Sequence, residues 1–303
     1  MGSSQWSSGA YDNLKASYTS QSTQQIFKST DVDADMHPKT IVFRESRDSD
    51  AHPLSVAIGV FCDVTGSMGM VPEALIRHKL GALMTTLIDH GVADAHVLFG
   101  AVGDHYSDRG ALQVGQFEAG TEELNLWLTK IWLEGSGGGQ NMESYPLAWH
   151  FMGKRTSIDC MEKRGEKGFL FTIGDESFHP VMESRFMSEY MGAASEDVRA
   201  EDCLKMAQRL YNVFHIHIEE TRTGRHLDTQ PWRQLLGERF IVCQDYNAVA
   251  EIIASTVAIV RGANLQAVLK SFDPAIAQSI STSLMNVSQA VKAPGGQPGV
   301  VAL

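Results

Sequence analysis

Acidic and hydroxyl side chains cluster directly after an apolar stretch near residue 60. Asp63, Thr65 and Ser67 follow the run SVAIGVFC at alternating positions. Because alternate side chains of an extended segment point the same way, they would offer one carboxylate and two hydroxyl oxygens to a common point. An all-oxygen set suits Mg²⁺, Mn²⁺ or Ca²⁺, and the lack of cysteine or histidine beside it argues against zinc. The alternative is a helix N-cap, in which Thr65 or Ser67 satisfies free backbone N–H groups without a metal.

Further acidic residues follow other apolar stretches. Asp104 and His105 come after HVLFGAV, and Asp175 and Glu176 come after GFLFTI. In an open parallel α/β sheet the carboxyl ends of the strands share one edge, where ligands bind. Like charges gathered there are costly unless they are protonated, solvated or neutralised, so a cation is expected at this edge. Glu176 is expected at the rim of the site, and so is Asp104 if the strand order is 3-2-1-4-5-6.

The apolar stretches alternate with amphipathic ones, which is the pattern of a parallel sheet wrapped by helices. Most expected strands are continuous apolar runs, as strands buried on both faces should be; they span 55–62, 96–102, 112–117, 168–173, 213–218 and 239–242. The expected helices span 72–90, 121–132, 144–152, 182–191, 196–211, 231–238 and 248–261. We therefore predict an α/β domain over residues 54–262, with a doubly wound, mostly parallel six-stranded sheet and helices on both of its faces.

Segments of different composition flank this domain. Residues 1–53 are rich in Ser, Thr, Gln and Asp, and we expect a polar leader that is partly flexible or docks elsewhere. Its strand signal is TIVF at residues 40–43. Residues 263–303 are expected to form one or two helices interrupted at Asp273-Pro274, followed by a Pro/Gly-rich tail.

Composition limits the function classes that this chain fits. It has 303 residues, with 25 Lys+Arg against 36 Asp+Glu and a formal net charge of −11. That balance disfavours broad binding to nucleic acid or to an anionic membrane surface. The first residues lack the basic and apolar regions of a secretion signal, and the four isolated cysteines are expected to be buried thiols in a reducing compartment. We expect a cytoplasmic protein, or one in a particle assembled in the cytosol.

The segment DVTGSM, placed after a buried strand, resembles the D-x-S/T-x-S opening of von Willebrand factor type A (VWA) domains. Their metal-ion-dependent adhesion site (MIDAS) is built on this turn. Two later segments resemble the family in the same order: the glycine-rich GGGQNMES before a helix, and TIGDES, with Asp175 at the family's second acidic position. The resemblance, over residues 54–262, implies that Thr65 and Ser67 bind the metal directly, and Asp63 and Asp175 directly or through water. Where the family has a loop threonine, Gln140 is the best positional match, with Asn141 next.

The resemblance implies a non-enzymatic module that presents a MIDAS-held Mg²⁺ to an acidic group of a partner protein. Intracellular relatives of this fold resemble adaptors of AAA+ ATPases or subunits of larger assemblies. Two alternatives remain open. One is a hydrolase or phosphotransferase that uses Mg²⁺ as a Lewis acid, with Asp104, His105 or Glu176 as nucleophile or base. The other is a structural assembly component with a vestigial metal site.

Overall fold

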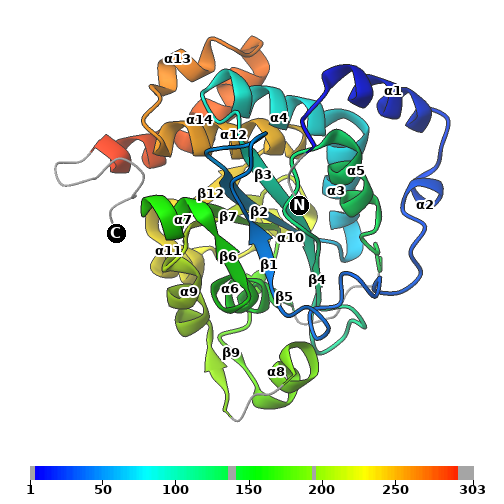
Figure 1. Ribbon diagram of the computed structural model, residues 1–303. Helices are drawn as coiled ribbons and strands as arrows, with labels where there is room; N and C mark the ends of the chain where they lie inside the picture. The colour runs from blue at the N-terminus through cyan, green and yellow to red at the C-terminus, as the bar shows by residue number, and fades with distance from the viewer. Residues whose placement is uncertain (1–3, 136–140, 193–195, 293–303) are drawn as a thin grey trace.

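A six-stranded sheet lies at the centre of the computed structural model, which describes residues 4–135, 141–192 and 196–292 apart from the side chains of Ser67 and 289–292 (Figure 1). The strand order is β12-β11-β7-β2-β3-β4. All neighbours are parallel except β3 and β4. The strands are β2 (Val56–Asp63), β3 (Ala95–Val102), β4 (Leu112–Val114), β7 (Gly168–Gly174), β11 (Tyr211–Ile218) and β12 (Phe240–Cys243). The predicted mostly parallel six-stranded α/β sheet is confirmed, and the strands lie in the order 3-2-1-4-5-6.

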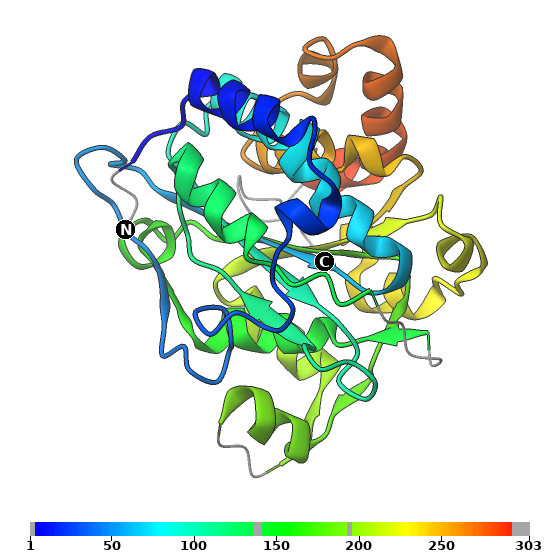
Figure 2. The same cartoon turned by 90° about the vertical axis from the view of Figure 1, so that its right-hand side faces the viewer.

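Alternate residues of each strand enter two hydrophobic cores, one on each face of the sheet. On β2, Ile58 and Val60 belong to the first core, whereas Ala57 and Phe61 belong to the second. The first core includes residues of α1 (Ser8–Tyr18), α2 (Thr23–Ile26), α3 (Met70–Ala74), α4 (Leu80–Asp89), α5 (Thr121–Thr129), α12 (Val249–Val260), α13 (Leu265–Leu269) and α14 (Pro274–Lys292). The second includes residues of α6 (Tyr145–Lys154), α7 (Asp159–Arg164), α8 (Ser184–Met191), α9 (Ala200–Gln208) and α11 (Gln230–Leu236). Helices therefore cover both faces (Figures 1 and 2).

Short elements shift several boundaries from their predicted positions. The predicted helix 72–90 is one helical run of α3, the π-helical turn η2 (Leu75–Lys79) and α4. The predicted strand 112–117 ends at Val114, and the predicted helices 182–191 and 196–211 begin later because β9 (Val181–Met182) pairs with β10 (Val198–Arg199). Other short elements had no sequence signal: β1 (Arg44–Ser46), η1 (Gly66–Gly69), β5 (Met142–Glu143), β6 (Thr156–Ile158), β8 (Ser177–Phe178), α10 (Arg222–His226), η3 (Gly237–Arg239) and η4 (Tyr246–Ala248).

The residues before the sheet domain pack against it. The strand predicted at residues 40–43 is wrong, because β1 starts at Arg44 to pair with β6 and leaves Val42 and Phe43 exposed. Ile41 of the predicted strand is buried in the second core, and α1 runs along α4 and α5 (Figure 2). Residues that enter the first core are Tyr11, Tyr18, Ile26, Phe27 and Met36.

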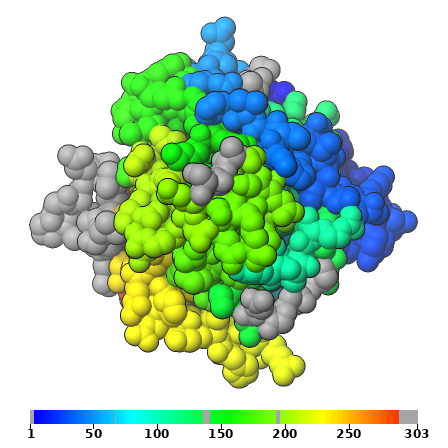
Figure 3. Space-filling view, turned by 90° about the horizontal axis from the view of Figure 1, so that it is seen from below, coloured from blue at the N-terminus to red at the C-terminus, as the bar shows by residue number. Residues whose placement is uncertain are grey.

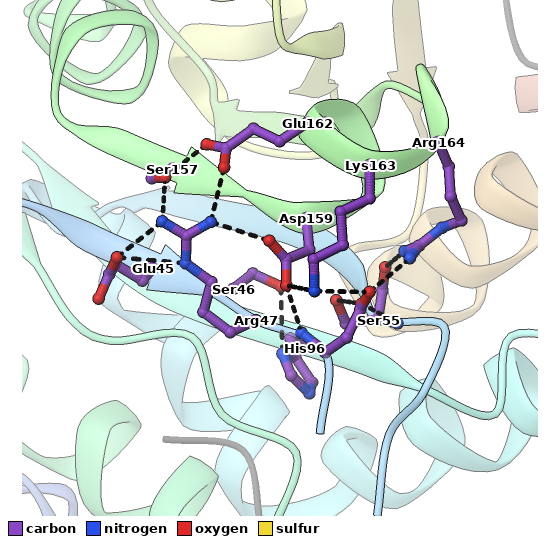
Figure 4. A network of polar contacts seen from close by, with 11 residues as sticks. Glu45, Ser46, Arg47, Ser55, His96, Ser157, Asp159, Glu162, Lys163 and Arg164 are labelled. Carbon is purple, nitrogen blue, oxygen red and sulfur yellow. Dashed lines mark hydrogen bonds and ion pairs between the residues drawn. The ribbon is translucent and has the colours of Figure 1, made fainter. Parts of the chain in front are cut away.

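A network of ion pairs ties the segment after β1 to α7 (Figure 4). Arg47 Nη1 lies 2.8 Å from Asp159 Oδ1 and 2.7 Å from Glu162 Oε2. The backbone N–H of Asp48 donates to Asp159 Oδ2 at 2.8 Å. Burial alone would raise the pKa of Asp159, but the hydrogen bonds from Lys163, from the Asp48 N–H and from Arg47 lower it to about 2. These charged contacts fix the N-terminal segment to the second face of the sheet domain.

The C-terminal helices α13 and α14 are separated at Asp273-Pro274, where the sequence predicted a break. Asp273 Oδ1 accepts from the backbone N–H groups of Ala275 and Ile276, and so caps α14. The four cysteines are buried and form no disulfide, as predicted. Within the described residues, no helix has the length and apolar character needed to cross a membrane.

Candidate metal centre

The turn after β2 lies at the carboxyl edge of the sheet, beside the loop after β7. Cys62 pairs with Ile173 across the parallel strands, so Asp63 lies next to Gly174. A methyl group placed on Gly174 would be 3.1 Å from Asp63 Cβ. After Asp63 the chain turns through Gly66, whose φ of +46° lies in the left-handed region that glycine adopts at little steric cost. The first and fourth strands of the domain therefore place their acidic loops side by side.

Asp63 is fully buried, and one of its two carboxylate oxygens accepts hydrogen bonds. Its Oδ1 accepts hydrogen bonds from the backbone N–H and from the hydroxyl of Thr65, both at 2.8 Å. Its Oδ2 is buried and has no hydrogen-bond partner among the described residues. Burial, reinforced by the charges of Asp175 and Glu176, raises the pKa of Asp63 well above its usual range despite the bonds from Thr65. The Thr65 hydroxyl donates to a carboxylate and makes no N-cap hydrogen bond to η1, so the capping alternative does not describe Thr65.

Glu143 faces the same point from β5. Its Oε1 lies 3.1 Å from the Thr65 hydroxyl, and its Oε2 is buried without a hydrogen-bond partner in the part of the chain that the structure describes. Parallel pairing of β5 with β8 holds this segment beside the loop that carries Asp175. Burial, with the charges of Asp63 and Glu176, raises the pKa of Glu143 to about 11.

The loop after β7 adds two more carboxylates. Asp175 is buried, and its Oδ2 accepts a 2.6 Å hydrogen bond from the hydroxyl of Thr221. Burial raises the pKa of Asp175 in spite of that bond. Glu176 is half-buried, and burial together with the charges of Asp175 and Asp104 raises its pKa to about 7. The loops after β2 and β7 and the short strand β5 thus bring four acidic side chains to one edge of the sheet.

This donor set fits a hard divalent cation. Carboxylate and hydroxyl oxygens are the ligands that Mg²⁺, Mn²⁺ and Ca²⁺ take. The unpartnered oxygens, Asp63 Oδ2 and Glu143 Oε2, each require a proton, a water or a cation to be satisfied in a buried position. Within the described ranges, neither of these carboxylates forms an ion pair with lysine or arginine. A single cation at this point could neutralise both.

The structure brings some of the sequence-predicted ligands together and leaves others aside. Asp63 and Thr65 are hydrogen-bonded, and Asp175 and Glu176 lie close enough for their charges to raise the pKa of Asp63. Within the described residues, however, no three carboxylates of this edge place their oxygens within 4.8 Å of one another. The side chain of Ser67 and the whole of Gln140 lie outside the described residues. Asn141 is exposed, with a left-handed φ of +53°, and its carbonyl accepts from the Ser177 N–H.

Two residues of the site, Glu143 and Thr221, were not predicted from the sequence. Glu143 is in the segment GGGQNMES, but a glycine-rich loop has no periodicity that fixes which side chain turns inward. Thr221 is 46 positions from its partner Asp175, and no local pattern connects them. The only available signal for Glu143 was its place immediately before a helix that follows the glycine-rich loop.

Asp104 belongs to a neighbouring polar cluster. Its Oδ1 accepts from His179 Nε2 at 2.8 Å, the shortest hydrogen bond that the Asp104 carboxylate makes within the described residues. His105 Nδ1 lies 2.7 Å from the Ser144 hydroxyl, while His105 Nε2 is buried and has no partner within residues 4–135, 141–192 and 196–292. Burial and the neighbouring His179 lower the pKa of His105 to about 4. The imidazole of His105 is therefore neutral at pH values near 7.

Comparisons with known proteins do not assign this chain to a family. No family model matches it, and no curated protein matches it. Among solved structures, the open conformation of the pilus adhesin SpaC from Lactobacillus rhamnosus GG is similar at 10% identity and a TM-score of 0.46, over 71% of this chain and 31% of the adhesin. Another form of the same adhesin gives 11% identity and a TM-score of 0.43, over 71% and 32%. The chain thus spans about a third of the adhesin, and TM-scores below 0.5 carry no conclusion on fold or function.

Proposed function

We propose that this chain is a VWA-like domain that binds Mg²⁺ at the carboxyl edge of its sheet and presents the ion to a partner protein. The observation that carries this proposal is the pair of buried carboxylate oxygens, Asp63 Oδ2 and Glu143 Oε2, that have no hydrogen-bond partner among the described residues. The other oxygen of each carboxylate contacts the Thr65 hydroxyl. In this proposal the ligands are Asp63, Thr65, Ser67 and Asp175, with Glu143 in the place of the family's loop threonine.

The topology supports the same proposal. In the order β12-β11-β7-β2-β3-β4, the chain leaves β2 towards β3 on one side and returns to β7 on the other. The crevice between β2 and β7 is thus the topological switch point, where open α/β sheets bind their ligands. Asp63 and Asp175 follow these two strands. We therefore propose a doubly wound, VWA-like arrangement for the domain.

Mg²⁺ is the preferred ion, with Mn²⁺ or Ca²⁺ as substitutes. Mg²⁺ demands an octahedron and keeps several waters, so a site with few protein ligands leaves a position for an acidic group of a partner. Glu143 carries a charge that threonine lacks, which strengthens the attraction for the cation. The partner we propose is a protein in the cytoplasm, either an AAA+ ATPase or a component of a larger assembly.

Calorimetric titration of Mg²⁺, Mn²⁺ and Ca²⁺ into the EDTA-stripped chain tests the site. We expect about one ion per chain, with binding lost in Asp63→Ala and retained in Asp50→Ala, where the aspartate is exposed. Absence of binding in the native chain would contradict the proposal. Partner capture with and without EDTA then tests presentation of the ion. A partner retained equally by the native chain in EDTA and by Asp63→Ala would rule out bridging through the metal.

One observation favours a second candidate function, a Mg²⁺-dependent hydrolase. The pKa of Glu176, raised to about 7 by burial and by Asp175, suits a general base that works near neutral pH. A screen for phosphatase and nucleotide hydrolysis with Mg²⁺ or Mn²⁺ tests this alternative. Turnover abolished in Glu176→Gln, with Mg²⁺ binding intact, would favour the hydrolase over the binding module.

A further inference from the structure

Three side chains of types that can ligate a metal lie together outside the proposed magnesium site and next to α8. Asp104 and His105 follow β3, and His179 follows β8. Each residue offers one nitrogen or oxygen as a possible ligand atom, and these three atoms all lie within 4.8 Å of one another. All three residues are buried. The Phe186 ring of α8 packs against His105 at 4.3 Å between ring centroids. The segment that contains α8 and α9 forms the centre of the face shown in Figure 3.

The His105 ring is oriented as a ligating histidine is. The Ser144 hydroxyl lies 2.7 Å from Nδ1 and also accepts the backbone N–H of His105 at 2.9 Å. A hydroxyl oxygen has two lone pairs, so Ser144 can accept Nδ1–H as well. In that tautomer the lone pair of the imidazole is on Nε2, the buried atom without a partner among the described residues. A metal-bound histidine usually donates a hydrogen bond from one ring nitrogen to a neighbouring group. That bond fixes the tautomer in which the other ring nitrogen binds the metal.

Asp104 and His179 supply the other two donors. His179 Nε2 donates to Asp104 Oδ1 at 2.8 Å. A cation that binds both atoms needs the neutral tautomer of His179 with its proton on Nδ1, so the Nε2 proton would move to Nδ1 of a neutral ring or pass to solvent from an imidazolium. Asp104 is held in place independently, because the Tyr106 N–H donates to Oδ1 and the Ser107 hydroxyl donates to Oδ2. Bonds of about 2.0–2.1 Å in a tetrahedral zinc site place ligand atoms roughly 3.3 Å apart. The three donor atoms already lie within 4.8 Å of one another, so their separations need to shorten by at most about 1.5 Å to reach that spacing.

We propose that Asp104, His105 and His179 form a second metal site, specific for Zn²⁺ or a similar borderline ion such as Co²⁺. Two imidazole nitrogens and one carboxylate oxygen favour such ions, whereas Mg²⁺ and Ca²⁺ prefer all-oxygen sites. Three protein ligands leave a fourth position for water. This site shares no ligand with the proposed magnesium site, so either can exist without the other.

Co²⁺ titration of the full chain in excess Mg²⁺, followed by visible absorption, tests this site. We expect about one Co²⁺ per chain, displaced by Zn²⁺. Binding should persist in Asp63→Ala, which removes only a ligand of the proposed magnesium site. It should also persist in His226→Ala, a matched control at an exposed histidine. His179→Ala and His105→Gln should each abolish it, and Ser144→Ala should weaken it about 10- to 100-fold.

The outcomes separate the second site from the first. Loss of Co²⁺ in both histidine variants, with far-UV circular dichroism and thermal unfolding unchanged in at least one of them, supports the proposal. Absence of Co²⁺ and Zn²⁺ binding in the native chain overturns it, as does binding that survives His105→Gln or His179→Ala. Failure of the proposed magnesium site appears separately, as absence of Mg²⁺ binding in the native chain.

Discussion

Replacing Glu143 by glutamine is expected to remove a large part of the pH dependence of the metal-free protein's stability. Glu143 is 1% exposed, and its Oε2 has no partner among the described residues. Burial and the charge of Asp63 raise its pKa from 4.5 to about 11. The folded protein therefore keeps a proton on this carboxyl over a pH range in which the unfolded chain has released it.

The sign and size of the effect follow from proton linkage. Because the folded state binds one proton more than the unfolded state between the two pKa values, the free energy of unfolding falls as the pH rises through this window. The slope is about 1.4 kcal/mol per pH unit, or about 4 kcal/mol between about pH 5 and pH 8. Glutamine is neutral in both states and keeps the length and shape of the glutamate side chain. At the higher pH and without metal, Glu143→Gln should therefore be the more stable protein by up to about 4 kcal/mol.

Urea unfolding followed by circular dichroism measures this difference. The native chain, Glu143→Gln and the exposed control Glu238→Gln would be compared at both pH values, in EDTA and in Mg²⁺. In EDTA, the native chain and the control should lose stability with rising pH and Glu143→Gln should lose less. In Mg²⁺ the native chain should gain stability and Glu143→Gln should gain less, because the cation replaces the proton on Glu143. A Glu143→Gln protein with the native pH slope, or one less stable than native in EDTA at the higher pH, would refute this reasoning.

Two other substitutions test contacts away from Glu143. Thr221→Val removes the hydroxyl that donates to Asp175 Oδ2 at 2.6 Å. Calorimetry should therefore show about tenfold weaker Mg²⁺ binding in this variant, and Thr221→Ser should restore the native affinity. An unchanged affinity in Thr221→Val would mean that Thr221 does not orient Asp175. Asp159→Asn should lower the free energy of unfolding at neutral pH by about 1–2 kcal/mol in urea titrations, because it weakens the charged bonds to Arg47 and Lys163. The native pKa is lowered from 3.8 to about 2, so the contribution of Asp159 is present above the unfolded pKa and is lost as the pH falls towards 2. A difference between native and Asp159→Asn that persists undiminished at about pH 2 would contradict this assignment.

The polar leader, residues 1–53, shows that amino-acid composition does not indicate which residues tertiary packing buries. It is rich in Ser, Thr, Gln and Asp, and the strand that its sequence predicted at residues 40–43 is wrong. The structure nevertheless buries Tyr11 and Met36 in the first core and fixes Arg47 against α7. Burial of these residues depends on surfaces that form only when the sheet and its helices are assembled, so no local pattern could identify it.

The sequence by itself determined the features that depend on local periodicity. Continuous apolar runs predicted the parallel strands, and the turn from Asp63 to Ser67 followed directly from its place after a buried run. Which loops meet was decided by the tertiary structure. The two-residue strands β5 and β8 are too short to show a period, yet their pairing places Glu143 beside Thr65 and brings His179 to Asp104. Periodicity records which face of an element is buried, whereas contacts between distant loops depend on strand order and register, which the whole fold sets.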